Sequence, residues 1–116
     1  MRKYMPVTDL CAREIYDPDG ALMIEYEVMA GESHVGRASA AFPAPEGARP
    51  SAADVVDAVN AKVAPEIVGM NVFDRTSLEE VLARLATGKD GSGDGELPGA
   101  FAGILEASRR AAELIR

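Results

Sequence analysis

The Gly- and Asp-rich stretch KDGSGDGE, at 89–96, is the part of the chain that most resembles a ligand-binding loop. Four of its residues fall at positions 1, 3, 5 and 6 of an EF-hand calcium loop. Position 12, where a bidentate Glu is required, is Phe101, so a calcium loop is not expected. The phosphate-binding patterns G-x-x-x-x-G-K-[ST] and G-x-G-x-x-G are absent too. We therefore expect a flexible linker over 88–96. The residues that fit the calcium pattern are Asp90, Ser92, Asp94 and Gly95.

Histidine and cysteine, the other common metal ligands, occur once each. His34 enters an expected strand from a turn, and no second ligand lies near it in the sequence. Cys11 lies between Leu10 and Ala12 in another expected strand, and we interpret it as a small buried hydrophobe rather than a nucleophile.

The many charged side chains have structural explanations. Glu25 and Glu27 lie two apart on one face of an expected strand, as on the solvated face of an antiparallel sheet. Acidic residues open one expected helix and arginines close another, as the helix dipole favours. The sequence therefore assigns no catalytic, cofactor-binding or metal-binding residue. The helix-end residues are Glu79, Glu80, Arg109, Arg110 and Arg116.

Composition restricts the class of protein. The 116 residues predict a single domain over 1–116, and the net charge of −7 argues against binding to nucleic acid or to an anionic membrane. The single cysteine rules out an intrachain disulfide and suits a reducing compartment. No signal peptide and no apolar run of about 20 residues is apparent, so we expect a cytoplasmic protein.

The first part of the chain, 1–42, reads as a three-stranded antiparallel meander. DPDG at 17–20 has the Pro and Gly of a tight turn, and GES at 31–33 makes a second turn. Between them, the stretch 21–30 alternates with a period of two, as in a half-buried strand.

The part that follows the proline-rich loop at 43–50 reads as helical, over 51–116. Valines and Ile67 recur every four residues after a Ser51 N-cap, and Pro65 is expected to kink or end this helix near Val63. A Thr76–Glu79 capping box predicts a second helix ending before Gly88, and 97–116 predicts a last one. The fold class is therefore α+β, with three to four helices packed on one face of the meander.

Four segments of the chain together resemble a known domain: AREIYDPDGALMIEYEV (12–28), VGRASAAFP (35–43), AVNAKVAPEIVGMNVFD (58–74) and PGAFAGILEASRRAA (98–112). They are similar to the N-terminal domain of enolase. The first keeps the family's Ala-Arg, Ile-Tyr-Asp, turn Gly and alternating acidic strand, and the third keeps its Ala-Pro, Ile-x-Gly-Met and Asp. The likeness spans roughly residues 7–115 in the same order. It implies the fold expected above, in a domain that caps a larger barrel and helps to form a dimer.

The chain also departs from the enolase pattern. The family's mobile loop supplies a serine that closes over the substrate, and the corresponding stretch at 43–50 has no serine. A (β/α)₈ barrel needs about 200 residues or more, so it does not fit here. Because enolases carry their metal-binding carboxylates, base lysine and acid glutamate on the barrel, the resemblance implies that this chain is not catalytic alone. It implies Mg²⁺ only together with a barrel partner.

The resemblance also suggests interface residues. In enolases the Arg that corresponds to Arg13 lies near the subunit interface, whereas the alternative is a strand Arg lying along a sheet edge. An apolar surface that once faced a barrel or a second subunit would need a cover. Candidates to line it are Tyr4, Met5, Met23, Met29 and Met70.

Two functions follow as hypotheses. The first is a non-catalytic interaction or oligomerisation module, which either self-associates or binds an enolase or another barrel protein. The second is the capping chain of a divided enolase-like enzyme, in which a separate barrel protein carries out Mg²⁺-dependent dehydration of 2-phosphoglycerate.

Overall fold

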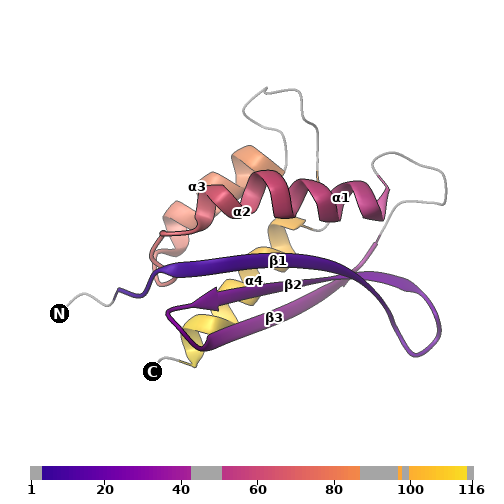
Figure 1. Cartoon of the computed structure of the whole chain (residues 1–116), viewed down its shortest axis with the longest axis horizontal. Helices are drawn as coiled ribbons and strands as arrows, with labels where there is room; N and C mark the ends of the chain where they lie inside the picture. The colour runs from indigo at the N-terminus through magenta and orange to yellow at the C-terminus, as the bar shows by residue number, and fades with distance from the viewer. Residues whose placement is uncertain (1–3, 43–50, 87–96, 98–99, 115–116) are drawn as a thin grey trace.

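A computed structural model describes residues 4–42, 51–86, 97 and 100–114 of the chain. Three antiparallel strands in the order β1-β2-β3 are followed by helices, so the predicted α+β class is confirmed (Figure 1). The strands are β1 (Val7–Tyr16), β2 (Leu22–Ala30) and β3 (His34–Ala41). The helical elements are α1 (Ala52–Ala58), η1 (Val59–Val63), α2 (Ala64–Ile67), α3 (Arg75–Ala86) and α4 (Ala100–Glu113).

Both predicted turns of the meander are present. Gly20 and Gly31 adopt positive φ angles of 85° and 62°, a backbone conformation that glycine reaches without a steric penalty. The first turn aligns Arg13 with Glu25, and the second aligns Glu27 with Arg37. These two registers decide which side chains meet on the sheet.

The core lies between the sheet and the helices. The even-numbered side chains of β2 point inward, and Ile24, Tyr26 and Val28 are almost completely buried. Helix α4 packs across β2 and β3 behind the sheet, and α1 and α2 run alongside β1 (Figure 1). The helices therefore cover one face of the sheet and leave the other face open.

The first helical stretch confirms the predicted cap and rules out one of the two outcomes expected at Pro65, an end of the helix near Val63. Ser51 and Asp54 form the expected capping box. Pro65 does not end the helix near Val63, because the five residues before Ala64 widen into a π-helical turn and the helix continues to Ile67. The wider turn accommodates the proline ring, which would otherwise clash with the preceding turn.

Helix α3 begins differently from the prediction. Asp74, not Thr76, caps it: its side chain accepts a hydrogen bond from the backbone N–H of Ser77 at 3.1 Å, and its carbonyl accepts one from Leu78. Glu79 instead forms an ion pair with Arg75 at 2.8 Å. The loop predicted at 43–50, the linker predicted at 88–96 and the end predicted at Gly88 lie outside the described residues.

Candidate functional site

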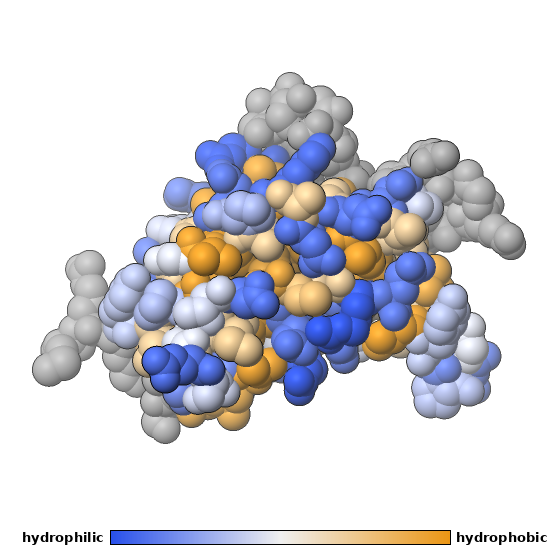
Figure 2. Space-filling model, in the orientation of Figure 1, coloured by the Kyte–Doolittle hydropathy of each residue, from blue (hydrophilic) through white to orange (hydrophobic). Residues whose placement is uncertain are grey.

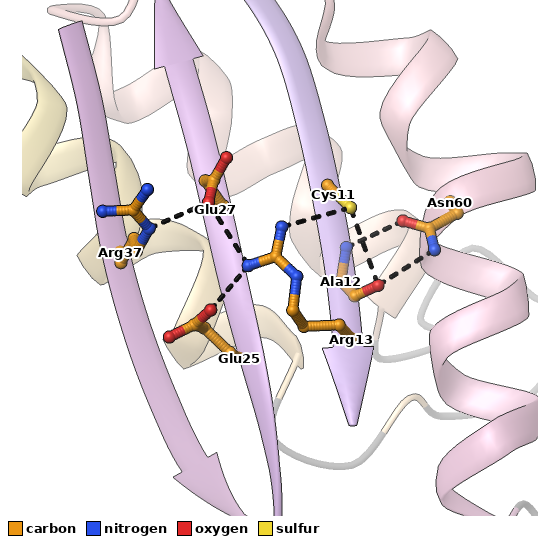
Figure 3. Close-up of polar contacts among 7 residues, drawn as sticks. All are labelled: Cys11, Ala12, Arg13, Glu25, Glu27, Arg37 and Asn60. Carbon is orange, nitrogen blue, oxygen red and sulfur yellow. Dashed lines mark hydrogen bonds and ion pairs between the residues drawn. The ribbon is translucent and has the colours of Figure 1, made fainter. Parts of the chain in front are cut away.

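The open face of the sheet carries a network of ion pairs at its centre (Figure 3). The Nη1 atom of Arg13 lies 2.5 Å from an oxygen of Glu25 and 3.2 Å from an oxygen of Glu27. Glu27 also binds the Nε atom of Arg37, at 2.8 Å. The network therefore links all three strands, with two positive and two negative side chains.

Charge pairing shifts the ionisation of this network in a consistent direction. The hydrogen bond from Arg37, followed by that from Arg13, holds the pKa of Glu27 below its usual value. The hydrogen bond to Glu25, with a smaller contribution from Glu27, raises the pKa of Arg13. Both shifts favour the charged forms of Glu27 and Arg13, and the network contains equal numbers of acidic and basic side chains.

Apolar side chains lie at both ends of this network. The register places Ile15, Met23 and Ala41 in one row at one end of the sheet, and Met29 beside Val35 at the other. Figure 2 looks onto this face and shows hydrophilic residues at its centre between hydrophobic ones. The methionines are only partly buried, so part of their apolar surface meets solvent.

Cys11 lies beside the network rather than within a reactive site. Its Sγ atom is 3.7 Å from Nη2 of Arg13 and 3.8 Å from the carbonyl oxygen of Ala12, and the residue is partly buried. No general base is within hydrogen-bond distance of this sulfur atom in the contacts described. The thiol is thus a half-buried neighbour of the Arg13 guanidinium.

A metal site does not fit this face. The described part of the chain contains no group of three His, Cys, Asp or Glu side chains that could hold a metal ion. The two carboxylates that lie together, Glu25 and Glu27, are already bound to arginines, which compete with a cation for the same oxygens. The residues present therefore do not fit Mg²⁺.

A second polar contact closes the outer edge of β1. The side-chain oxygen of Asn60 accepts a hydrogen bond from the N–H of Ala12 at 2.8 Å, and its nitrogen donates one to the Ala12 carbonyl at 3.1 Å. The amide thus occupies the place of a neighbouring strand (Figure 3). Asn60 lies in the π-helical turn η1, which positions it toward β1.

A groove lies on the helical side, between the start of α3 and the second half of α4. Ser108 lines it, but its hydroxyl already donates to the Ile104 carbonyl at 2.8 Å. At the rim, Arg109 pairs with Glu106 and Glu113, and these carboxylates raise the pKa of Arg109. The groove therefore offers apolar surface and no polar group poised for chemistry.

The predicted interface residues fall in two places. Arg13 and Met23 share the open face of the sheet, and so does Met29. Tyr4 lies away from them, with its hydroxyl donating to the Gly69 carbonyl at 3.2 Å, and its neighbour Met5 packs partly buried against the core. Met70 is also partly buried and accepts the Val7 N–H through its carbonyl.

The sequence pattern indicates Glu25 and Glu27 only as residues of a solvated sheet face, and it does not connect Arg37 to them. The turn at 17–20 contains the missing signal, because a tight hairpin there places Arg13 opposite Glu25. Asn60 had no such signal, since its partner lies 48 residues away in the sequence.

Comparison with known proteins gives a fold. No family model matches the chain. The structure is similar to a crystal structure of muconate cycloisomerase from Pseudomonas fluorescens, with a TM-score of 0.70 and 13% sequence identity over 97% of this chain. At this identity the likeness shows the fold alone, a three-stranded meander followed by helices.

The match covers 30% of the muconate cycloisomerase chain, so this chain spans under a third of that protein's length. The fold expected from the sequence is thereby confirmed, while the assignment to enolase stays a prediction. The described helices include none long and apolar enough to cross a membrane.

Proposed function

We propose that this chain is a non-catalytic interaction module of the capping-domain type, which acts by binding a second protein through the open face of its sheet. The observation that carries the proposal is the composition of that face. Its charged groups are paired with one another and neutral in sum, while methionines at both ends expose apolar surface. Such a face suits a protein surface better than an ion or a small polar ligand.

A barrel-containing protein is the partner that the fold favours. The chain matches 97% of its own length to part of a larger enzyme chain. In the enolases that the sequence resembles, the corresponding domain caps a barrel. The alternative function follows from the same observation: a capping chain of a divided enolase-like enzyme, in which the barrel protein supplies Mg²⁺ and the chemistry. A cytoplasmic location remains a prediction.

The test is a pull-down of the tagged chain from its native lysate, identified by mass spectrometry. The eluate is assayed for Mg²⁺-dependent formation of phosphoenolpyruvate from 2-phosphoglycerate and for cycloisomerisation of muconate. We expect a stoichiometric barrel protein that Met23→Glu releases and Leu114→Glu, at an exposed position on α4's end, does not. Activity in the eluate would select the divided enzyme, and inactivity the passive module.

Two results would contradict the proposal. If Met23→Glu and Leu114→Glu retain the same partner equally well, the open face is not the binding surface. Activity of the purified chain alone, with no other protein present, would show that it is an enzyme in its own right.

A further inference from the structure

The two outer edges of the sheet differ in how they are covered. Along β1, the Val7 N–H binds the Met70 carbonyl at 2.8 Å, and its carbonyl accepts the Gly69 N–H at 2.7 Å. Further along, Asn60 binds both backbone groups of Ala12. The β1 edge is therefore occupied by other parts of the same chain, which leaves β3 as the edge to consider.

The backbone groups that point away from the sheet at β3 follow from two hydrogen bonds. The Phe42 N–H binds the Leu22 carbonyl, so the even-numbered residues of β3 face β2. The Arg37 carbonyl instead accepts a bond from Nη1 of Arg110 at 2.6 Å, outside the sheet. The odd-numbered residues thus direct their N–H and C=O groups outward: Val35, Arg37, Ser39 and Ala41.

Few of these outward groups are bonded. Among the described residues, Arg110 provides the one hydrogen bond to them. The strand contains neither Lys nor Pro, the residues that commonly protect an edge, and its side chains from Gly36 to Ala41 are small apart from Arg37. The β3 edge therefore remains able to pair with another strand.

We propose that the β3 edge pairs antiparallel with the β3 edge of a second copy of this chain, with Arg37 of each copy opposite Ser39 of the other. A two-fold axis beside Ala38 then joins the two sheets into one of six strands. Val35 falls opposite Ala41 of the second copy, so all four outward residues pair once the exposed Arg110 side chain leaves the Arg37 carbonyl to the Ser39 N–H of that copy. This inference goes beyond the proposed function and does not depend on it, since the open face stays free.

Repulsion between the two Arg37 side chains disfavours another register. Shifting one strand by two residues would place Arg37 directly opposite Arg37 of the second copy. Like charges in that position destabilise a sheet. In the proposed register each Arg37 meets a neutral serine instead. Each guanidinium also keeps Glu27 of its own copy at 2.8 Å, so the pairing leaves no arginine without its carboxylate.

Helix α4 also leaves room in this register. It lies closest to β3 at Gly36, where a Cβ atom would lie 2.1 Å from the Ala107 carbonyl oxygen. Gly36 of one copy faces Ala40 of the other, so the two close-approach points are four residues apart, about 13 Å along the strand. The points where α4 approaches β3 most closely in the two copies are therefore kept apart.

The test places charges at Ser39 and measures the monomer–dimer equilibrium by sedimentation equilibrium from micromolar to millimolar protein. We expect the mass to rise from 12.2 kDa toward twice that value. Ser39→Arg should raise the dissociation constant and Ser39→Glu should lower it, each about 2- to 30-fold, because two equivalent cross-strand pairs with Arg37 change together. Ala53→Arg and Ala53→Glu, exposed on α1, are the matched controls.

Effects on folding are separable from effects on pairing. Within one copy Ser39 lies opposite Glu25, so Ser39→Arg should stabilise the monomer while it weakens the dimer, and Ser39→Glu should do the reverse. Urea unfolding of the dilute protein measures the first effect. Ser39→Arg therefore keeps the test valid even if Ser39→Glu fails to fold.

Hydrogen exchange gives a second readout. The amides of Val35, Arg37 and Ser39 should gain protection as protein concentration rises, whereas those of Ala38 and Ala40 should not change. A monomer at every concentration would overturn the proposal. So would a dimer whose affinity is indifferent to the charge at Ser39, or one that the Ala53 controls change equally.

Discussion

At the scale of single residues, Glu27 is the side chain that holds the open face together. It accepts bonds from both Arg13 and Arg37, and its side chain is only 20% exposed. Removing its charge leaves the arginines of the two outer strands, Arg13 and Arg37, without a shared partner. Glu27 thus joins side chains of the two outer strands across β2.

We predict that Glu27→Gln lowers the free energy of unfolding by about 1 kcal/mol at neutral pH. Because pairing lowers the pKa of Glu27 in the folded state, its stabilisation is present above the unfolded pKa, near 4.5, and is lost as pH falls through the folded pKa. The difference between the two proteins should therefore shrink in acid. Urea unfolding across pH measures it, with Glu14→Gln, exposed on β1, as the control.

Tyr26, unlike Glu27, has a buried polar group that makes no hydrogen bond with the described residues. Its ring is fully buried, and its hydroxyl makes no hydrogen bond with the described residues. Burial raises the pKa of this phenol to about 12, against 10.0 for an unperturbed tyrosine. The hydroxyl therefore costs desolvation energy in the folded state.

We predict that Tyr26→Phe folds at least as stably as the parent at neutral pH, since it removes the unpaired hydroxyl and keeps the ring. Between pH 10 and about 12 only the unfolded parent ionises here, so its free energy of unfolding should fall with rising pH. Tyr26→Phe should lack that part of the fall. Urea unfolding at several alkaline pH values checks this, and a marked loss of stability at neutral pH would point to a hidden partner for the hydroxyl.

At the scale of elements, hydrogen bonds join the π-helical turn η1 to strand β1. The turn allows the helix to pass Pro65 and at the same time presents Asn60 to the Ala12 backbone. A regular α-helix would carry Asn60 to a different angle around the axis, because each π-type bond adds a residue to its turn. The proline and the covered edge are therefore connected.

We predict that Asn60→Ala costs about 1–2 kcal/mol in the free energy of unfolding, because both backbone groups of Ala12 lose their partner. The amide of Ala12 should also exchange faster with solvent than its neighbours. Lys62→Ala, in the same π-helical turn, is the control for loss of a side chain there. If Ala12 exchange is unchanged in Asn60→Ala, the amide does not protect the edge.

At the scale of the whole molecule, two glycines set the distance between the sheet and α4. A Cβ atom at Gly103 would lie 2.4 Å from the Tyr26 ring, and one at Gly36 would lie 2.1 Å from the Ala107 carbonyl oxygen. Real Cβ atoms do not approach so closely, so any side chain at either site would push the two layers apart.

We predict that Gly103→Ala destabilises the protein by about 1–3 kcal/mol. The sign is informative, because Gly→Ala within a helix would otherwise stabilise it by about 1 kcal/mol. Combining the change with Tyr26→Leu, which removes the ring, should cost less than the sum of the two single changes. Urea unfolding of the four proteins measures this coupling, and strict additivity would contradict the close contact.

The sequence by itself determined the parts that depend on near neighbours. The turn at 17–20, the alternation of β2, the Ser51 cap and the apolar stripe of the first helix are all present as expected. Each depends on residues within a few positions of one another, where backbone preference and periodicity decide the outcome. The α+β class follows from the order of these elements.

Only the tertiary structure decided the features that join distant residues. They are the hydrogen bonds between Asn60 and Ala12, the close contact of Gly103 with Tyr26, and the bond from Arg110 that covers one carbonyl of the β3 edge. Each depends on segments far apart in the sequence. No local pattern encodes such contacts, because they arise from how layers pack once the elements exist. The surfaces that we propose for binding other proteins, the open face and the β3 edge, belong to this second group.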